Sequence, residues 1–329
     1  MLIVRVPLRI SLGGGGTDLF NWYSKHGSFL ITATINKFIY ITLSRRNLDN
    51  DFWLSYSKIE NLKDVKSIKH SIIKKILLKN LNLKNLEIHT ISEVPSNSGL
   101  GSSGSLSVGL IQALNSMLKK NISPKILSEK SIDIEMNLNK KNAGKQDQYA
   151  AAYGGLIKLT INKKGFTKVE KLKISKKKIK IFQNNIFLIY IKNRRYASQI
   201  LKKQSKVINE KKSAIDVMKK IQLLGIKSCN VLEKGKIDDY GKILDEHWNL
   251  KKKVGNFMTN KKIEELYLSL KKNGSSGGKI IGAGGGGFLM SYVPKNNHKK
   301  FLNYLKKKKL NVLDWRFHYE GSKVIFNDE

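Results

Sequence analysis

Three glycine-rich segments, far apart along the chain, constrain this sequence more than any other feature. They are PLRISLGGGGTDL, EVPSNSGLGSSGSL and GGKIIGAGGGGFL, at residues 7–19, 93–106 and 277–289. A run of glycine is costly, because the unfolded chain has the most conformational freedom to lose there. Glycine also permits positive φ angles and lets backbone N–H groups approach a ligand closely. Since phosphate is the commonest ligand of such groups, we expect the three segments to line one site for a phosphorylated ligand.

The middle segment carries the strongest signal of the three. An alternating stretch at 88–92 predicts a strand before it, and leucines recur every four residues after it, which is typical of an amphipathic helix. The free N–H groups and the dipole of that helix would face the loop and attract an anion. Ser102 and Ser103 offer hydroxyls to a phosphate oxygen or a magnesium ion. The segment lacks the Gly-Lys-Ser/Thr of a Walker loop, and the alternative is a tight turn with a serine N-cap.

The segment PSNSGLGSSGS resembles the phosphate loop of the GHMP kinases, the superfamily of galactokinase, homoserine, mevalonate and phosphomevalonate kinases. The other two glycine segments stand where that superfamily has its first and third motifs. With AGKQDQYAAAYGGL at 143–156 and DEHWNLKK at 245–252, they most resemble the branch that phosphorylates D-glycero-D-manno-heptose 7-phosphate at its anomeric carbon. The resemblance implies ATP and Mg²⁺ as cofactors. It also implies an ATP site made by Pro95, Ser98, Gly99, Leu100, Gly101, Ser102, Ser103 and Gly104.

The order of predicted elements indicates an α+β fold. Strands with intervening helices come first, and helices with a small sheet follow. With 329 residues, the chain is long enough for two domains. The resemblance implies an N-terminal domain like the second domain of ribosomal protein S5 and a ferredoxin-like C-terminal domain. We place these domains at 1–185 and 186–329, with ATP between them, and expect helices at 107–119 and 124–138 and a closing strand at 312–319.

Acidic residues are scarce, so few carboxylates can serve catalysis. Asp147 lies in AGKQDQY, and the resemblance makes it the catalytic carboxylate, a general base or an orienting charge for the attacking hydroxyl. The alternative is an N-cap for the short helical turn that follows. Arg9 could steady the nucleophile or the transferred phosphoryl group, or be a surface arginine on a strand. Glu135 follows Ile134 in a predicted helix and could face solvent, but the resemblance implies that it binds magnesium with Ser103 or Ser102.

The acceptor site is expected from the first and third glycine segments. The resemblance makes Asp18 an acceptor of hydrogen bonds from sugar hydroxyls. A phosphate on the sugar needs cations, and Arg194 and Arg195 are notable because arginine binds phosphate in a bidentate manner. Lys251 and Lys252 are further candidates. The predicted substrate-binding set is Gly14, Gly15, Gly16, Thr17, Asp18, Arg194, Arg195, Gly284, Gly285 and Gly286.

The net charge of +37 comes from 62 Lys and Arg against 25 Asp and Glu, which raises a nucleic-acid-binding hypothesis. The lysine runs mostly lack the interleaved aromatic residues that stack on bases. Lysine, asparagine and isoleucine also share A/T-rich codons, so genome composition is a sufficient explanation. We therefore expect a small phosphosugar as the partner, with no nucleic acid and no membrane. A basic field would also speed the capture of anionic ATP and phosphosugar.

The remaining composition favours a cytoplasmic protein, and we expect a monomer or a homodimer. No stretch of 18 apolar residues is present, and no signal segment precedes the first predicted strand. The single cysteine, Cys229, cannot form an internal disulfide, and no Cys/His cluster predicts zinc. The sequence thus predicts a sugar-1-kinase that makes a heptose 1,7-bisphosphate for nucleotide-heptose synthesis. The alternatives are a GHMP kinase for fucose, galactose or, less in keeping with GGGGTD, a mevalonate-like alcohol, and a basic nucleic-acid-binding protein.

Overall fold

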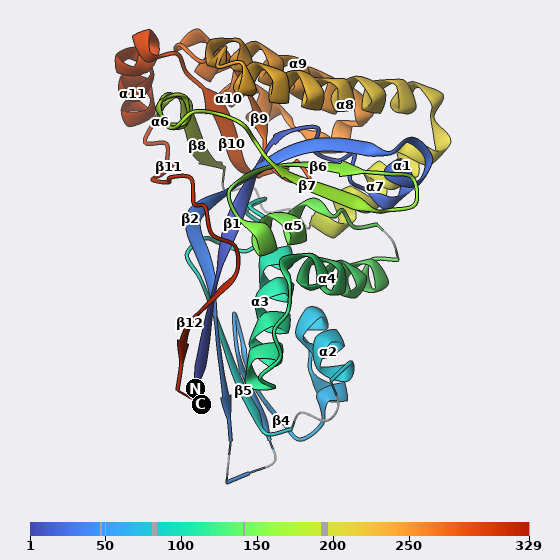
Figure 1. The fold of residues 1–329 in the computed structure, drawn as a ribbon. Coiled ribbons are helices and arrows are strands. Elements are labelled where there is room, and N and C mark those ends of the chain that lie inside the picture. Colours follow the sequence, from blue (N-terminus) through green and yellow to red (C-terminus); the bar gives the residue numbers. More distant parts are fainter. Residues whose placement is uncertain (47, 50, 81–83, 141, 192–196, 329) are drawn as a thin grey trace.

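Two β-sheets form the frame of the computed structural model, which describes residues 1–329 except 47, 50, 81–83, 141, 192–196 and 329 (Figure 1). The first sheet has the order β12-β1-β2-β5-β3-β4, with β6 paired to β2 and β7 to β6. Its strands are β1 (Leu2–Gly13), β2 (Ser28–Arg45), β3 (Phe52–Ser55), β4 (Ile59–Leu62), β5 (Leu86–Ser92), β6 (Leu156–Ile161), β7 (Thr167–Lys171) and β12 (Lys323–Asn327). The second has the order β11-β8-β10-β9, from β8 (Ile186–Ile191), β9 (Gly277–Ile280), β10 (Gly287–Tyr292) and β11 (Val312–Leu313).

The alternation of residues in strand β1 determines which of its side chains face the core and which face the pocket. Its even-numbered apolar residues are fully buried: Leu2, Val4, Val6, Leu8, Ile10 and Leu12. Because successive side chains of a strand point to opposite faces, this pattern turns Arg9 and Ser11 toward the other face. Both line the pocket described below. Core formation therefore fixes the direction of Arg9.

Helices cover one face of the first sheet (Figure 1). They are α2 (Ser71–Leu78), α3 (Ser102–Met117), α4 (Pro124–Leu138) and α5 (Gln146–Tyr153), while α1 (Phe20–His26) follows the first glycine segment. Helix α3 packs on β1 and β2, with α4 and α5 against it. Helix α4 has the predicted bounds and start, because the Ser123 side chain accepts from Ile126 N at 3.3 Å and Pro124 occupies the first turn.

The second half is mainly helical and shares the core of the first. It contains α6 (Lys176–Asn184), α7 (Ala197–Glu210), α8 (Lys212–Glu233), α9 (Tyr240–Val254), α10 (Lys261–Lys272) and α11 (His298–Lys307). Helix α8 packs against β1 and β2, and α9 packs against β9. The buried Tyr240 hydroxyl on α9 donates to the Leu12 carbonyl of β1 at 2.7 Å. One continuous apolar cluster therefore runs from β1 to β10. None of the helices in the described ranges is both long and apolar enough to cross a membrane.

The mixed sheets and helices confirm the α+β class, but two predicted elements differ. The closing strand predicted at 312–319 is wrong: β11 covers Val312–Leu313, and beyond it Phe317 makes an isolated bridge to Ile35. The chain then returns to the first sheet, where β12 pairs with β1 and brings the two termini together (Figure 1). The predicted boundary at 185 did not include this return and stays a prediction. The helix predicted at 107–119 starts earlier, at Ser102, because small residues let its first turn pack against α5.

Candidate active site

One pocket of about 800 Å³ receives residues from all three glycine segments. Ser11, Gly15, Gly16 and Asp18 come from the first, a run including Gly99 and Ser103 comes from the second, and Gly282 and Ala283 come from the third. The first two segments belong to the N-terminal half and the third to the C-terminal half. The pocket therefore lies where the two halves meet.

The second and third segments are in direct backbone contact. Gly99 has φ +85°, and a Cβ on it would lie 2.5 Å from the Ile281 carbonyl oxygen. Only glycine provides both that conformation and that approach. The Phe288 amide also donates to the Ser98 carbonyl at 3.2 Å. The two loops thus form one continuous wall of the pocket.

The N-terminus of α3 is open to a ligand. Its N-cap, Gly101, has φ +82° and makes no side-chain cap, whereas Ser123 caps α4 and Asn260 caps α10. The first N–H groups of α3 are therefore left for an anion, which the helix dipole favours. Among the described residues, five that line the pocket have a buried polar atom without a partner: Ser11 Oγ, Ser98 Oγ, Ser102 Oγ, Gln146 Nε2 and Gln148 Oε1. Such atoms fit a polar ligand such as a triphosphate.

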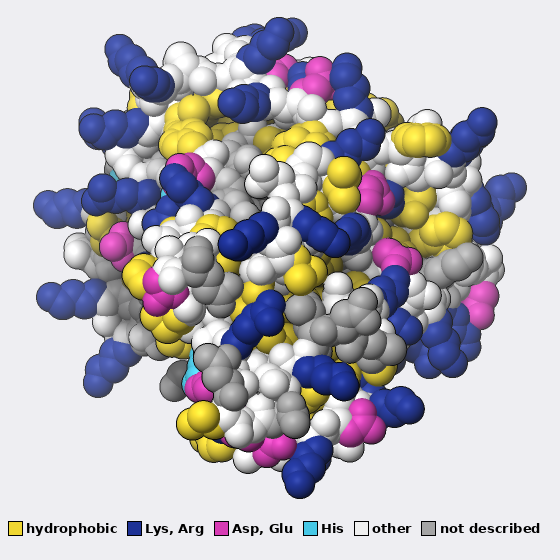
Figure 2. Space-filling model, turned by 60° about the horizontal axis from the view of Figure 1, so that its bottom comes forward, with side chains coloured by type: hydrophobic (Ala, Val, Ile, Leu, Met, Phe, Trp, Pro, Cys, Tyr) yellow, Lys and Arg dark blue, Asp and Glu magenta, His cyan; other side chains and the backbone are white. Residues whose placement is uncertain are grey.

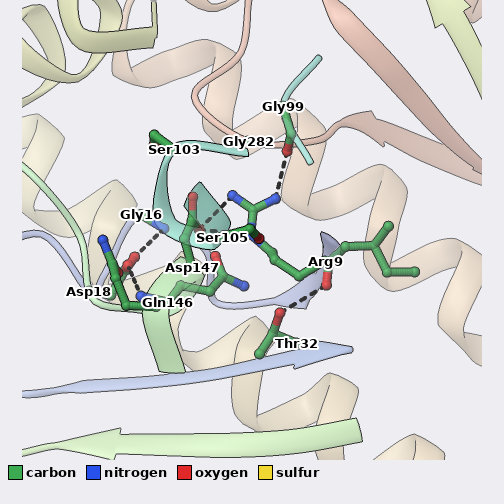
Figure 3. Close-up of polar contacts among 12 residues, drawn as sticks. Arg9, Gly16, Asp18, Thr32, Gly99, Ser103, Ser105, Gln146, Asp147 and Gly282 are labelled. Atoms are coloured by element: carbon green, nitrogen blue, oxygen red, sulfur yellow. Dashed lines mark hydrogen bonds and ion pairs between the residues drawn. The ribbon is translucent and has the colours of Figure 1, made fainter. Parts of the chain in front are cut away.

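Arg9 and Asp147 form the central ion pair of the pocket (Figure 3). Asp147 Oδ1 accepts from Arg9 Nε at 2.7 Å and lies 2.6 Å from Nη2, while Nη1 donates to the Gly99 carbonyl at 2.6 Å. Asp147 lies in the first turn of α5, and a Cβ on Gly104 of α3 would come within 2.6 Å of its Cβ. Arg9 thus joins the predicted catalytic carboxylate to the phosphate loop. The alternative of a surface arginine is wrong, because Arg9 is 5% exposed.

Asp18 is a buried carboxylate held by backbone amides (Figure 3). It accepts from Gly16 N at 3.2 Å and from Gln146 N at 3.0 Å. Burial raises the pKa of Asp18, and the nearby charge of Asp147 adds to the rise, although the amide hydrogen bonds oppose it. An oriented acceptor close to Asp147 suits a hydroxyl-rich ligand.

Glu135 is also buried, so the solvent-facing alternative for this residue is wrong. It accepts from Gln148 Nε2 at 2.9 Å, from Ser103 Oγ at 3.3 Å and from Ser107 Oγ at 3.4 Å. Burial, reinforced by Asp147, raises the pKa of Glu135 to about 7. The described residues hold no cluster of three or more His, Cys, Asp or Glu side chains. One carboxylate with an adjacent hydroxyl is nevertheless the donor set that Mg²⁺ uses beside substrate phosphates and water.

Several predicted site residues support the pocket from behind. Leu100 is buried, and its carbonyl accepts from Arg9 N at 2.9 Å. Thr17 Oγ1 donates to the Gly14 carbonyl at 2.7 Å and so closes the first loop. Pro95, near the start of the second segment, is instead exposed and is not among the residues that line the pocket.

The glycines of the third segment and the basic residues predicted to bind the sugar phosphate do not all line the pocket. Gly284 packs on Met258, and Gly285 N donates to the Met258 carbonyl at 2.9 Å, so these glycines brace the loop, with Gly286 after them. Lys252 forms an ion pair with Glu264 at 2.7 Å, whereas its neighbour Lys251 lines the pocket. Arg194 and Arg195 lie outside the described residues.

Sequence reasoning missed two groups of pocket residues. One is Lys279 with His247, which lie on β9 and α9 beside Lys251. The position of Lys279 within the third glycine segment was the signal that could have found it. The other is an apolar end with two rings, made by Ile39, Ile72, Ile91, Leu106, Leu138, Tyr56 and His70. These residues come from separate elements, so no sequence motif unites them.

Comparisons with known proteins agree with this geometry. The model of the GHMP kinases N terminal domain matches residues 67–155, and that of the GHMP kinases C terminal matches residues 230–311. A curated D-glycero-alpha-D-manno-heptose 7-phosphate kinase from Campylobacter jejuni subsp. jejuni serotype O:2 is 29% identical over 97% of both chains. A bifunctional fucokinase/GDP-fucose pyrophosphorylase from Arabidopsis thaliana is 27% identical over 62% of this chain and 19% of that protein.

A solved structure shares the whole fold. It is described as a D-glycero-D-manno-heptose 1-phosphate kinase from Bacteroides thetaiotaomicron, with a TM-score of 0.81, 23% identity and 100% coverage of both chains. The names of the two heptose kinases differ in the phosphate that they state, a 7-phosphate in one and a 1-phosphate in the other.

Proposed function

Because this chain belongs to the GHMP kinase superfamily and is an ATP-dependent sugar kinase, we propose that it phosphorylates the anomeric hydroxyl of D-glycero-D-manno-heptose 7-phosphate. The product would be the 1,7-bisphosphate, a precursor for nucleotide-heptose synthesis. The observation that carries this proposal is the Arg9–Asp147 pair, with Asp18 beside it, facing the open N-terminus of α3. The likeness to the Campylobacter relative supports the choice of sugar.

The two substrates would occupy the two ends of the pocket. The triphosphate of ATP would lie over the N-terminus of α3, where Ser98 and Ser102 have unpartnered hydroxyls. Its base would extend toward the apolar end lined by Tyr56 and Ile91. The sugar would lie against the first glycine loop, with Asp18 accepting from its hydroxyls. This arrangement would bring the anomeric oxygen between Asp147 and the terminal phosphoryl group.

The residues of the chain then have distinct tasks. Asp147 accepts the hydrogen bond of the attacking hydroxyl and receives its proton as the bond to phosphorus forms. Arg9 holds Asp147 in place and stabilises the negative charge that develops on the phosphoryl oxygens. Ser103 and Glu135 would hold Mg²⁺, which neutralises phosphate charge when bound. The position of the pocket between the two halves would limit the access of water and so favour transfer to the sugar over hydrolysis.

A fucose- or galactose-type acceptor is the second candidate, since the fucokinase from Arabidopsis covers 62% of this chain. The two candidates differ in one chemical requirement. A heptose phosphate needs a cationic contact for the phosphate that it already carries, whereas fucose and galactose carry none.

A coupled ADP-release assay with purified protein tests the acceptor. The acceptors would be D-glycero-D-manno-heptose 7-phosphate, the heptose 1-phosphate, the free heptose, fucose, galactose and mevalonate. We expect kcat/KM to be at least about tenfold higher for the 7-phosphate than for the free heptose, because a charge-assisted hydrogen bond contributes roughly 1.5–3 kcal/mol. Phosphorus NMR of the product should show a new phosphate on the anomeric carbon. A higher kcat/KM for an unphosphorylated hexose, or a phosphate at another carbon, would reject this substrate.

A further inference from the structure

Two lysines with buried side chains face the pocket from the C-terminal half. Lys251 on α9 is 8% exposed and Lys279 on β9 is 3% exposed. Lys251 Nζ donates to the Gly282 carbonyl at 2.6 Å, and Lys279 Nζ lies 3.4 Å from His247 Nδ1. All three basic side chains, Lys251, Lys279 and His247, line the pocket. The roles proposed above for the second glycine segment and for the Arg9–Asp147 pair do not involve these three side chains.

No described carboxylate forms an ion pair with either lysine. Lys145 provides the comparison within the same chain, because it is equally buried but has Glu129 at 3.4 Å. A buried ammonium group without a carboxylate is costly. A ligand that supplies the missing negative charge would offset this unfavourable free energy of burial.

The surroundings of the two lysines increase this need for an anion. Burial, assisted by the charge of Arg9, lowers the pKa of Lys251 to about 8, while Asp18 opposes the change. The pKa of Lys279 is lowered well below its ordinary value by burial and then by Lys251. His247 has a strongly lowered pKa for the same reasons, burial first and then Lys279. A bound anion would relieve the repulsion among these groups.

The position of the cluster indicates what the anion is. Lys251 is bonded to Gly282, and a Cβ on Gly282 would lie 2.9 Å from the Gly99 backbone of the phosphate loop. Arg9 also donates to Gly99, at its carbonyl oxygen. The lysines therefore lie at the seam between the second and third glycine segments, where phosphorylated substrates would meet (Figure 3 labels Gly99 and Gly282).

We propose that Lys251 and Lys279 form a two-lysine subsite that binds a tetrahedral phosphoryl group. Two sources share this chemistry: the terminal phosphoryl group of ATP and the phosphate already carried by the sugar. The inference rests on the proposed function in one respect: ATP and the phosphorylated sugar are the two substrates of the proposed reaction. With ATP as the source, the lysines would stabilise charge on the transferred group. With the sugar as the source, they would determine specificity for a phosphorylated acceptor.

The test replaces each lysine by methionine, which has a similar length and no charge. Lys253→Met is the matched control, because Lys253 follows on the same helix and is exposed. Wild type and variants are titrated calorimetrically with ADP and with the non-hydrolysable ATP analogue AMP-PNP, both with Mg²⁺. In parallel, kcat/KM is measured for a phosphorylated sugar and for the same sugar without its phosphate.

If the source is ATP, the preference for AMP-PNP over ADP should fall about ten- to hundredfold in the Lys251 and Lys279 variants. If the source is the sugar, the preference for the phosphorylated acceptor should fall by a similar factor. Either result supports the subsite and identifies its ligand, and Lys→Arg variants should restore part of the preference. The nucleotide titrations need no sugar, so a wrong heptose assignment does not affect them.

The stability of the ligand-free variants separates a binding role from a structural one. Since removal of an unpaired buried charge relieves repulsion, the methionine variants should unfold at the same temperature as wild type or higher. Folded variants that keep both preferences would overturn the proposal. Variants that lose the cooperative unfolding transition would also overturn it, because the lysines would then be structural.

Discussion

Individual charged residues of the site are paired unevenly. Arg9 has a carboxylate partner in Asp147, whereas Glu135 is bonded by neutral groups and Asp18 by backbone amides. Lys251 and Lys279 form no ion pair with a carboxylate of the described residues. In the proposed function, the two buried carboxylates would serve the metal and the sugar, and the two buried lysines would serve a phosphoryl group. Each single substitution should affect a different kinetic quantity.

Replacement of Asp147 by asparagine should reduce kcat on the order of 10²-fold or more, because asparagine cannot accept the proton of the hydroxyl. KM for the sugar should change little, since Asp18 and the first glycine loop remain. Steady-state kinetics with the best acceptor from the screen measures both. Asp133→Asn, an exposed position on α4, is the control. Wild-type turnover in Asp147→Asn would remove the catalytic assignment.

Replacement of Glu135 by glutamine should raise the Mg²⁺ concentration needed for half-maximal turnover, because the neutral amide is a weaker ligand for a hard cation. The fold should persist, since glutamine keeps the shape of the side chain among Ser103, Ser107 and Gln148. A magnesium titration of turnover measures the shift, with the exposed Glu265→Gln as control. An unchanged magnesium requirement would mean that the metal lies elsewhere.

Lys251 should make stability depend on pH in a defined window. Its pKa is about 8 in the ligand-free fold, below the ordinary 10.4 of an unfolded chain. The unfolded state thus binds more protons between these values, and the contribution of Lys251 to the free energy of unfolding rises with pH there. The groups around it are Arg9, Asp18, Lys279 and His247.

Urea unfolding at pH 8 and at pH 10 measures this contribution as a difference between wild type and Lys251→Met. The free energy of unfolding of wild type should increase relative to that of Lys251→Met as the pH rises from 8 to 10. The contributions of tyrosines and of other lysines, which titrate in both proteins, cancel in this difference. A difference that is constant with pH would show that the ammonium group is not destabilised by burial.

Among the elements, the contact between the two glycine loops is the most sensitive. Helix α3 presents its N-terminus, and the β9–β10 loop closes on it through Gly99 and Gly282. The loop of the C-terminal half thereby contacts the segment of the N-terminal half for which we propose phosphate binding. A change at this contact should affect nucleotide binding more than stability.

Gly99→Ala tests this contact. Alanine at φ +85° should cost about 1–2 kcal/mol of stability through backbone strain, and its Cβ should also push the Ile281 carbonyl away. Gly235→Ala is a matched control, because Gly235 has φ +70° but faces only the flexible side chain of Lys178. Both variants should lose stability, and only Gly99→Ala should bind AMP-PNP more weakly. Equal nucleotide affinities would show that the loop contact is not required.

Over the whole molecule, basic side chains stand mostly singly among uncharged and apolar surface on the face that Figure 2 shows. Their field adds to the attraction of anionic substrates toward the pocket where the two halves meet. The two halves share one apolar cluster, and β12 returns to β1. Relative movement of the halves is therefore limited by packing as well as by the loop contact.

Mixing with duplex DNA tests the nucleic-acid alternative. If the net charge of +37 comes from solvated surface lysines, DNA binding should be weak and should collapse with salt, because counterion release drives it. Fluorescence anisotropy at about 0.05 M and about 0.2 M salt measures the loss. Affinity that persists at the higher salt, or that depends on base sequence, would revive that alternative.

The glycine loops, the alternation of β1 and the start of α4 follow from the sequence alone. Local rules suffice for these, because strand alternation, N-capping and glycine content act over a few residues. The hydrogen bond between Arg9 and Asp147, which are 138 positions apart, depends on the tertiary structure. The burial of Lys251 and Lys279 and the return of β12 to β1 depend on it as well. These depend on which surfaces meet when the core closes, and no local pattern of residues encodes that contact.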